Sequence, residues 1–389
     1  MAGAPVEAGL PRRVRPALAA GLPLLAAAAF AMNVGMGMQN AAYTNFAVQD
    51  LHITAAQLGV VEAMRESSGL LCFLVAALAA RLALPRVAGV ALVVMGCGMA
   101  ALGQVQGIEG LIVANFVWGI GFHAYSPISP TLALQMSDDH GRRAGLLGRV
   151  SAVGALATPV GTLLVLALLP WLHLRGQFLP AGLLALAGGV LMFLMPNPRP
   201  GPRPRLVLRR AYLPFYVLTF MDGARKQILI TFAVFALVSV FHAPVVTVSL
   251  LLLGSSLLTM FASAWIGRWI ARFGERAVLA VTGAVLVPLF AGYGLATTLP
   301  VMMTLYILDN TLFTSNVALQ TWVSRKAPAD DVGPTLAVGT TVNHISSVIV
   351  PLLAGLLWAV YGYRDIFLGG AGIVLCMLVL TLVLLPKAD

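Results

Sequence analysis

The sequence places ionisable side chains deep inside long apolar segments. Glu62, Arg65 and Glu66 share one such segment, and their spacing of three and four residues puts them on one face of a helix. Two ionised carboxylates beside one guanidinium are costly in an apolar environment, so one carboxyl group should bind a proton. Such a group could carry protons across a membrane. The alternative is a structural ion network in which Arg149 or another cation pairs with the second carboxylate.

A second charged group combines one carboxylate with two cations. Asp222 lies three residues before Arg225 and four before Lys226, so all three side chains share one helical face. One positive charge therefore remains locally. It could bind an anionic or carboxylate-bearing solute, it could be neutralised across the bundle by Asp309 or another acid, or it could act in gating between two domains.

Further polar residues interrupt the apolar segments. Asn33 and Asn40 share a helix face, and they could hydrogen-bond either a polar solute or a neighbouring helix. His123 and His344 could change protonation near neutral pH, or stay neutral and buried. The candidate substrate-binding residues are Asn33, Asn40, His123, Asp222, Arg225, Lys226, Asp309, Asn343 and His344, and the candidate proton-coupling residues are Glu62, Arg65 and Glu66.

The composition identifies the kind of protein that holds these residues. Of 389 residues, 59% are hydrophobic and 10% are charged, against roughly a quarter charged in a soluble domain. The mean hydropathy is +0.92. These values exclude a soluble enzyme, a nucleic-acid-binding protein and a disordered chain, and they indicate an integral membrane protein. The three cysteines, Cys72, Cys97 and Cys376, are too far apart for a disulfide framework or a zinc motif.

The apolar segments predict an all-α membrane protein with twelve transmembrane helices. The first segment follows a basic stretch but is too long for a signal peptide, so we expect it to be retained. The expected helices are 17–47, 55–80, 87–105, 109–136, 144–169, 177–195, 211–240, 245–267, 277–297, 300–323, 334–360 and 366–386. At 1.5 Å per residue, Glu66, Asp222, Asp309 and His344 lie about 15 Å into their helices, near the middle of a ~30 Å hydrocarbon core.

The basic residues between these helices predict the topology. With the N-terminus in the cytoplasm, the cytoplasmic side holds 18 of the 24 Lys and Arg residues, the outer side holds Arg175 and Arg364, and four lie inside helices. This asymmetry places both termini in the cytoplasm and the protein in the cell (inner) membrane. The +10 net charge is therefore a topology signal rather than a nucleic-acid-binding surface.

The chain divides into two halves. Residues 196–210 form a Pro- and Arg-rich connector between a six-helix half at 1–195 and a second at 211–389. Pro159 and Pro351 occupy similar places in the fifth helix of each half, and a charged loop follows the fourth helix of each half. Two repeated halves are typical of transporters that bind their solute between them.

The loop between helices 8 and 9 resembles a motif of the major facilitator superfamily. Gly267, Arg272, Gly274 and Arg276 match its pattern Gly-x-x-x-Asp-Arg-x-Gly-Arg-Arg/Lys, while Ala271 stands at the Asp position. The resemblance implies a cavity between two six-helix halves and a gating role for this loop. It also implies that helices 3, 6, 9 and 12 are an outer scaffold. In agreement, the expected spans of these four helices contain no charged residue.

Two sequence patterns leave other functions open. Gly154, Pro159 and Gly161 resemble a helix-5 motif of proton antiporters in the same superfamily, which would suit a broad-specificity drug:proton antiporter; the alternative is a kinked helix with small residues for packing. The methionines around Met36 and Met95 could bind copper, which would suit a copper transporter.

We therefore expect a secondary active transporter that moves a small solute by alternating access and is coupled to protons, with an anionic solute as one option. No motif for ATP binding or hydrolytic catalysis occurs, so we expect neither an enzyme nor a cofactor. An intramembrane enzyme or a receptor would not need this set of buried charges. The expected partners are a small-molecule substrate, protons and the lipid bilayer, with no nucleic acid, and the expected state is a monomer.

The topology can be tested by labelling. In a chain without its native cysteines, Arg203→Cys places a thiol in the connector, and Gln106→Cys places one in an expected outer loop. A membrane-impermeant maleimide outside intact cells should react with the second variant only. Ready labelling of the connector would overturn the topology.

Overall fold

The computed structural model describes residues 21–71, 82–136, 140–196 and 207–386. Within these ranges the regular elements are all helices. Each of the twelve expected segments is helical over most of its described length. Eight helices are long and apolar enough to cross a membrane, and Phe178–Phe193 is a shorter apolar helix.

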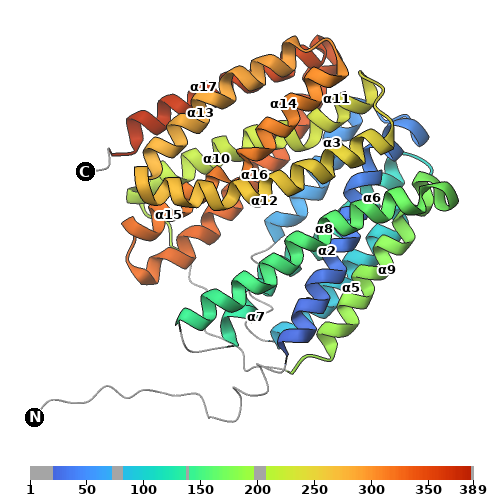
Figure 1. Cartoon of the computed structure of the whole chain (residues 1–389), viewed down its shortest axis with the longest axis horizontal. Coiled ribbons are helices and arrows are strands. Elements are labelled where there is room, and N and C mark those ends of the chain that lie inside the picture. Colours follow the sequence, from blue (N-terminus) through green and yellow to red (C-terminus); the bar gives the residue numbers. More distant parts are fainter. Residues whose placement is uncertain (1–20, 72–81, 137–139, 197–206, 387–389) are drawn as a thin grey trace, which may run out of the picture.

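The helices fall into two groups, seen as the blue-to-green and yellow-to-red parts of Figure 1. The first contains α2 (Leu22–Asn45) with η1 (Phe46–Asp50), α3 (Ala55–Ser67) with η2 (Ser68–Leu71), α5 (Leu84–Leu102), α6 (Ile108–Tyr125), α7 (Ile128–Gln135), α8 (His140–Gly176) and α9 (Phe178–Phe193). The second contains η3 (Arg210–Tyr212), α10 (Leu213–Gln227), η4 (Ile228–Ala233), α11 (Val234–Ser239), α12 (Val245–Phe273), α13 (Glu275–Leu295), α14 (Leu299–Thr311), η5 (Phe313–Asn316), α15 (Val317–Lys326), α16 (Ala329–Tyr361) and α17 (Tyr363–Leu384).

Several boundaries differ from the sequence prediction. The expected fourth helix is broken at Ser126 and Pro127 into α6 and α7. The expected loop at 267–276 is largely helical, because α12 continues to Phe273 and the chain turns only at Gly274, where φ is +79°. The scaffold helices α5, α13 and α17 begin two or three residues earlier than expected. Their first turns therefore carry charges, and the expected absence of charge holds only for their interiors.

The four scaffold helices pack in pairs, α5 on α9 and α13 on α17. Leu179 and Leu183 on α9, and Leu375 and Val379 on α17, are large apolar side chains that are exposed. A water-facing surface would not present such a continuous apolar face. These helices are thus suited to contact lipid, as the resemblance implied.

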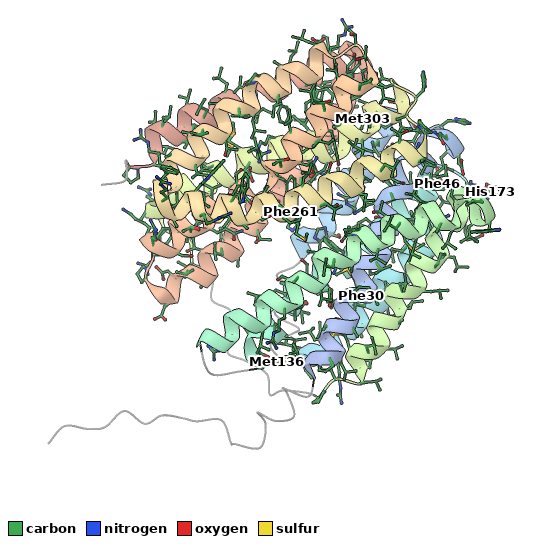
Figure 2. All side chains as sticks on the ribbon, viewed as in Figure 1. Phe30, Phe46, Met136, His173, Phe261 and Met303 are labelled. Atoms are coloured by element: carbon green, nitrogen blue, oxygen red, sulfur yellow. The ribbon has the colours of Figure 1, made fainter. Side chains whose placement is uncertain are left out.

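The two groups of helices meet where α3 packs on α16, where α8 packs on α12, and where α2 packs on α11 and α12. We call the end near Met195 and Arg209 the linker end and the opposite end, where Phe46 and His173 lie in Figure 2, the far end. At the far end, Asn45 donates a hydrogen bond of 3.0 Å to the Ala243 carbonyl. Gly59 and Gly355 also bring α3 and α16 into backbone contact. Toward the linker end, where α7 and α15 lie, the ribbons of the two groups diverge (Figure 1).

The two groups share an unusual turn at the far end. His52 and His242 both adopt φ of +54°. In each turn the next amide bonds back six residues, Ile53 to Ala47 at 2.9 Å and Ala243 to Leu237 at 2.8 Å. The same local geometry at corresponding places is what a duplicated unit would produce.

The α2–α8 contact depends on the absence of a side chain at Gly161. A Cβ there would overlap the Val34 carbonyl, whereas a Cβ on Gly148, in the same helix, would meet nothing within 4 Å. Gly161→Ala should therefore lower the stability by about 1–3 kcal/mol, and Gly148→Ala should be neutral or slightly stabilising. Thermal unfolding of both purified variants measures this. Equal stability would contradict the described packing.

Candidate functional site

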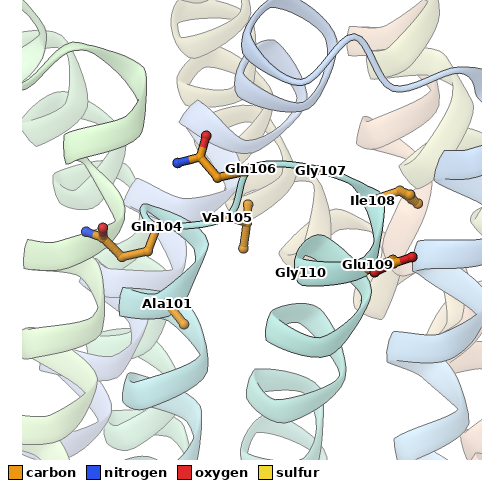
Figure 3. Close-up of a pocket in the computed structure, with 8 residues that line it drawn as sticks. All are labelled: Ala101, Gln104, Val105, Gln106, Gly107, Ile108, Glu109 and Gly110. Atoms are coloured by element: carbon orange, nitrogen blue, oxygen red, sulfur yellow. The ribbon is translucent and has the colours of Figure 1, made fainter.

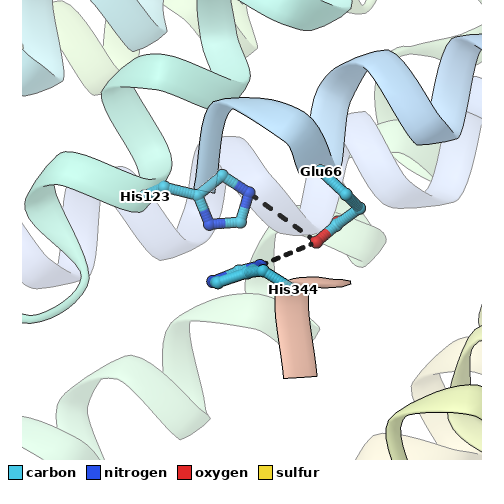
Figure 4. Close-up of side chains that lie close together, drawn as sticks. All are labelled: Glu66, His123 and His344. Atoms are coloured by element: carbon cyan, nitrogen blue, oxygen red, sulfur yellow. Dashed lines mark hydrogen bonds and ion pairs between the residues drawn. The ribbon is translucent and has the colours of Figure 1, made fainter. Parts of the chain in front are cut away.

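The first charged cluster joins the two groups of helices. Arg65 contacts Glu62 at 2.6 Å and Glu66 at 2.6 Å. The other oxygen of Glu66 faces two imidazoles, Nδ1 of His344 at 3.2 Å and Nε2 of His123 at 3.8 Å (Figure 4). His344 comes from α16, whereas Glu66 and His123 come from α3 and α6. The expected triad on the second helix is thus confirmed as a contact group, extended by a histidine from each group of helices.

Local structure holds this cluster in place. The α3 helix begins with a capping box in which Thr54 and Gln57 satisfy each other's backbone amides. Trp118 of α6 lies 5.4 Å from the Arg65 guanidinium, in a cation–π contact. The Trp118 indole in turn donates to Asn115 at 2.9 Å. Gly69 leaves the space that the His344 ring occupies.

The charges of this cluster do not balance when both imidazoles are neutral. Two carboxylates and one guanidinium sum to −1, and one bound proton brings the sum to zero. Arg149 does not provide the balance, because it is exposed and forms no ion pair with Glu62 or Glu66. The cluster is largely buried, with Glu62 3% and Glu66 8% exposed, so an uncompensated charge here is costly.

The same donors resemble part of a metal site. One oxygen of Glu66 and one nitrogen each of His123 and His344 lie within 4.8 Å of one another. However, Arg65 already holds the other oxygen of this carboxylate at 2.6 Å. A fixed positive charge at this distance opposes a second cation, so we assign no metal to the cluster.

The second charged cluster lies within the second group of helices. Asp222 contacts Arg225 at 2.9 Å and Lys226 at 2.9 Å. Asp309 of α14 approaches Arg225 at 3.5 Å. Two carboxylates thus face two cations, and the positive charge left over on α10 is neutralised. Both Arg225 and Asp309 are 0% exposed, so a solute does not reach either in this conformation.

The α16 helix links the two clusters. His344 contacts Glu66, while the neighbouring Asn343 and Ser346 pack against Gly223, the residue after Asp222. Lys226 completes its surroundings with the Phe313 ring, 4.5 Å from its ammonium. A shift of α16 would therefore change the surroundings of both clusters.

Two neighbouring cavities are lined by residues that belong to neither cluster. The first, of about 310 Å³, is lined by α2, α6, α7 and α8 and includes Asn33. The second, of about 330 Å³, lies between α8 on one side and α12 and α14 on the other. Ala155 and Thr158 of α8 line both, so the cavities are neighbours. The second cavity lies where the two groups of helices meet, and the first adjoins it within the first group. Together they are the candidate solute site.

The other candidate residues are spread more widely. Asn33 lines the first cavity, although its amide donates to the Ala29 carbonyl at 2.7 Å. Asn40 is exposed and lines neither cavity. Met95 is fully buried in the core while Cys97, two residues on, is exposed. These two sulfur groups therefore do not converge on a copper site.

The antiporter-like segment of α8 serves close packing. Gly161 approaches the Val34 carbonyl, and Gly154 faces the Asn33 amide. This arrangement corresponds to the packing alternative for the motif, in which small residues let two helices approach.

The segment 267–276, which resembles the superfamily loop motif, makes its described contacts within the second group of helices. Arg276 donates to the Leu382 carbonyl at 2.7 Å, and Glu275 pairs with Arg325 at 3.3 Å. Gly267 and Arg272 lie within α12 rather than in a loop. The contacts described here brace α13 against α15 and α17, and the gating role of Gly267, Arg272, Gly274 and Arg276 stays a prediction.

A third hollow lies far from the clusters, at the far-end turn between α5 and α6 (Figure 3). Its lining comes from one short stretch, residues 101–110, with Glu109 as its charged member. A hollow formed by a single turn does not collect side chains from both groups, so we do not assign the solute to it.

Sequence reasoning missed most of the cavity lining. On α12, Ser255, Thr259 and Ser263 recur every four residues and therefore lie on one face, which lines the second cavity. Tyr306 and Asn310 of α14 also line it. The four-residue recurrence of hydroxyls was visible in the sequence, whereas the pairing of α12 with α8 was not.

Comparison with known proteins identifies the family. The model of the Major Facilitator Superfamily matches residues 25–215 and 215–389. The chain belongs to this superfamily. The resemblance noted in the sequence is thereby confirmed, and the superfamily fold accounts for the two groups of helices with a cavity between them. No curated protein sequence matches the chain significantly.

Solved structures with the same fold include transporters of different kinds. A mutant form of the nucleoside transporter NupG superposes with a TM-score of 0.79 at 14% identity, covering 95% of this chain and 100% of that one. A bacterial homologue of the human lysosomal transporter Spinster gives 0.71 at 12%, covering 95% of each chain. The human organic anion transporter MFSD10 gives 0.62 at 15%, covering 95% and 99%. At identities of 12–15%, these similarities show that the chain shares the fold, and they say nothing about its substrate.

The balance of the second cluster predicts a non-additive mutant cycle. Asp309→Asn or Arg225→Gln alone leaves an unbalanced charge in a dry site and should destabilise the protein by about 3–5 kcal/mol. The double variant keeps the Asp222–Lys226 pair. Its loss of stability should be smaller than the sum of the losses of the two single variants. Thermal unfolding at neutral pH measures all three. Strictly additive losses would contradict the four-charge network.

Proposed function

We propose that this superfamily member is a secondary active transporter that moves a small solute by alternating access and couples that movement to protons. The observation that carries the proposal is the Glu66–His344 contact, which bridges the two groups of helices. A coupling group should sit where the moving parts meet, because only there does motion change its surroundings.

Alternating access requires contacts that break and re-form at each end. The far-end contacts, the Asn45 hydrogen bond and the Gly59–Gly355 approach, join helices of different groups and involve few side chains. The exposed Gly148 and Gly333, toward the linker end, have no atom within 4 Å of a built Cβ. This arrangement supports a state in which the solute cavities reach the linker end.

Proton coupling follows from the charge of the first cluster. With one bound proton, the group of Glu62, Arg65, Glu66 and the two imidazoles is neutral and tolerates a dry contact. Without that proton it carries −1 and needs water or separation. The Tyr43 hydroxyl on α2 lies within electrostatic range of Glu62 and Arg65. Proton binding and the contact between the two groups are therefore linked in free energy.

The other expected substrates and ions receive less support. The two cations of α10 are already paired with carboxylates, so they offer no free anion site in this conformation. The antiporter-like segment has a packing role, and Met95 and Cys97 differ in exposure, which gives no support to a shared copper site. The same proposal includes a location in the inner membrane with cytoplasmic termini, which rests on the charge distribution. It also includes a monomeric state, which rests on the presence of both halves in one chain.

Glu66→Gln tests the coupling. Purified protein in liposomes, with a chelator present, is assayed with a panel of radiolabelled sugars, nucleosides, carboxylates and cationic drugs. For the solute that wild-type protein accumulates under a pH gradient, Glu66→Gln should still catalyse exchange but should no longer accumulate it. The reason is that an amide cannot take up and release the coupling proton. Glu62→Gln is assayed alongside, because either carboxylate could carry it.

The matched control is Glu109→Gln, the same chemical change in the exposed α5–α6 turn, and it should behave as wild type. Unchanged accumulation in both cluster variants would move the coupling site to Asp222, Asp309 or His344. Absence of flux for every solute of the panel would contradict the transporter proposal itself.

A further inference from the structure

The two neighbouring cavities are lined by apolar side chains, such as Leu147 and Leu252, and by polar groups that are hydroxyls and amides rather than charges. The second cavity is lined on α12 by Ser255, Ser256, Thr259 and Ser263. On the opposite side the first cavity presents Ser129, Ser151 and Asn33. Among the described residues, no Lys, Arg, His, Asp or Glu lines either cavity. The charged clusters therefore lie outside the candidate solute site.

Some of these polar groups have no partner within the part of the chain that the structure describes. The Ser255 hydroxyl is buried, with the residue 4% exposed, and makes no hydrogen bond there. By contrast, Thr259 donates to the Asn310 carbonyl at 3.0 Å, and Ser263 donates to the Thr259 carbonyl at 2.7 Å. A buried hydroxyl without a partner is costly, so Ser255 is suited to bond a group that enters the cavity.

The α8 side of the cavities offers a backbone acceptor. Pro159 has no amide hydrogen, so the carbonyl four residues earlier, that of Ala155, has no partner of the usual helical kind. Ala155 lines both cavities. This carbonyl is therefore a candidate acceptor for a solute donor, opposite the hydroxyls of α12.

The size of the cavities limits the solute. Volumes of about 310 and 330 Å³ are at the lower end of the ~300–1,000 Å³ range of ligand pockets. A small molecule with several groups that both donate and accept hydrogen bonds matches the many hydroxyls of the lining. An anion would be left there without a cation to pair with, at a large desolvation cost.

We infer that the transported solute is uncharged and carries several hydroxyl groups, as a sugar or a nucleoside does. This inference rests on the proposed transport function and specifies its substrate class. It assigns separate tasks to the two sets of residues: the hydroxyl-lined cavities bind the solute, and the charged cluster around Glu66 couples the movement.

The test compares neutral solutes with their anionic analogues. Binding to the purified full-length protein is measured for glucose, ribose, inositol, uridine and adenosine, and for gluconate, ribose 5-phosphate, uridine monophosphate and adenosine monophosphate. At least one neutral solute should bind, and its anionic analogue should bind at least tenfold more weakly. Absence of binding by every neutral solute, or tighter binding of the anions, would overturn the inference.

Two variants locate the binding. Ser255→Ala should weaken binding of the neutral solute about 2- to 12-fold, the effect of one hydrogen bond. The fold should be unaffected, because the hydroxyl has no protein partner to leave behind. Ser324→Ala is the matched control, since its exposed hydroxyl donates to the Gln320 carbonyl outside both cavities. Equal affinity of wild-type protein and Ser255→Ala would remove α12 from the site.

The liposome assay separates the two proposals. If anions or cationic drugs accumulate under a pH gradient while neutral solutes do not, transport stands and the substrate class is wrong. If no solute moves, the transport function fails, whichever solutes bind.

Discussion

The cost of burying charge in an apolar medium governs the design of this protein. A membrane-embedded chain has few charged residues, and each buried charge must find a partner or a proton. The second cluster meets this requirement with two carboxylates and two cations in one group of helices. The first cluster does not meet it with ions alone, because Arg65 faces both Glu62 and Glu66. That imbalance, placed where the two groups meet, is the physical basis of the proposed coupling.

The two clusters differ in charge balance, and we assign them different roles. The balanced cluster around Arg225 is fully buried and stabilises the second half. In the proposed mechanism the unbalanced cluster takes up the coupling proton. His344 would pass that change to α16, which also packs on α10 through Asn343 and Ser346. The solute cavities lie apart from both, so solute chemistry and coupling chemistry need not compete for the same side chains.

Much of the fold could be predicted from the sequence, because membrane helices are encoded by local composition. The helical segments followed from the apolar runs, and the family followed from the motif at 267–276 and the two halves. The grouping of Glu62, Arg65 and Glu66 followed from their spacing along one helix. Contacts between helices were harder to predict, because they depend on tertiary packing. The sequence offered Asp309 as one of several partners for Arg225, and it did not indicate that His123 and His344 meet at Glu66. The hydroxyls of α12 were missed because Ser and Thr are also common in helix packing, and α12 was ended too early because Gly267 and Arg268 resemble a loop.

The most direct test measures the separation of the two halves as a function of pH. Spin labels are attached at Gly148→Cys and Gly333→Cys, one in each half and both exposed toward the linker end, in a chain without native cysteines. The distance between the two labels measures the separation of the halves. In wild-type protein, lowering the pH from about 8.5 to 5.5 should increase the long-distance population, because the proton-loaded, neutral cluster favours the contact seen at Glu66 and His344. In Glu66→Gln the distribution should no longer depend on pH. A wild-type distribution that ignores pH, or the same pH response in Glu66→Gln, would contradict the account.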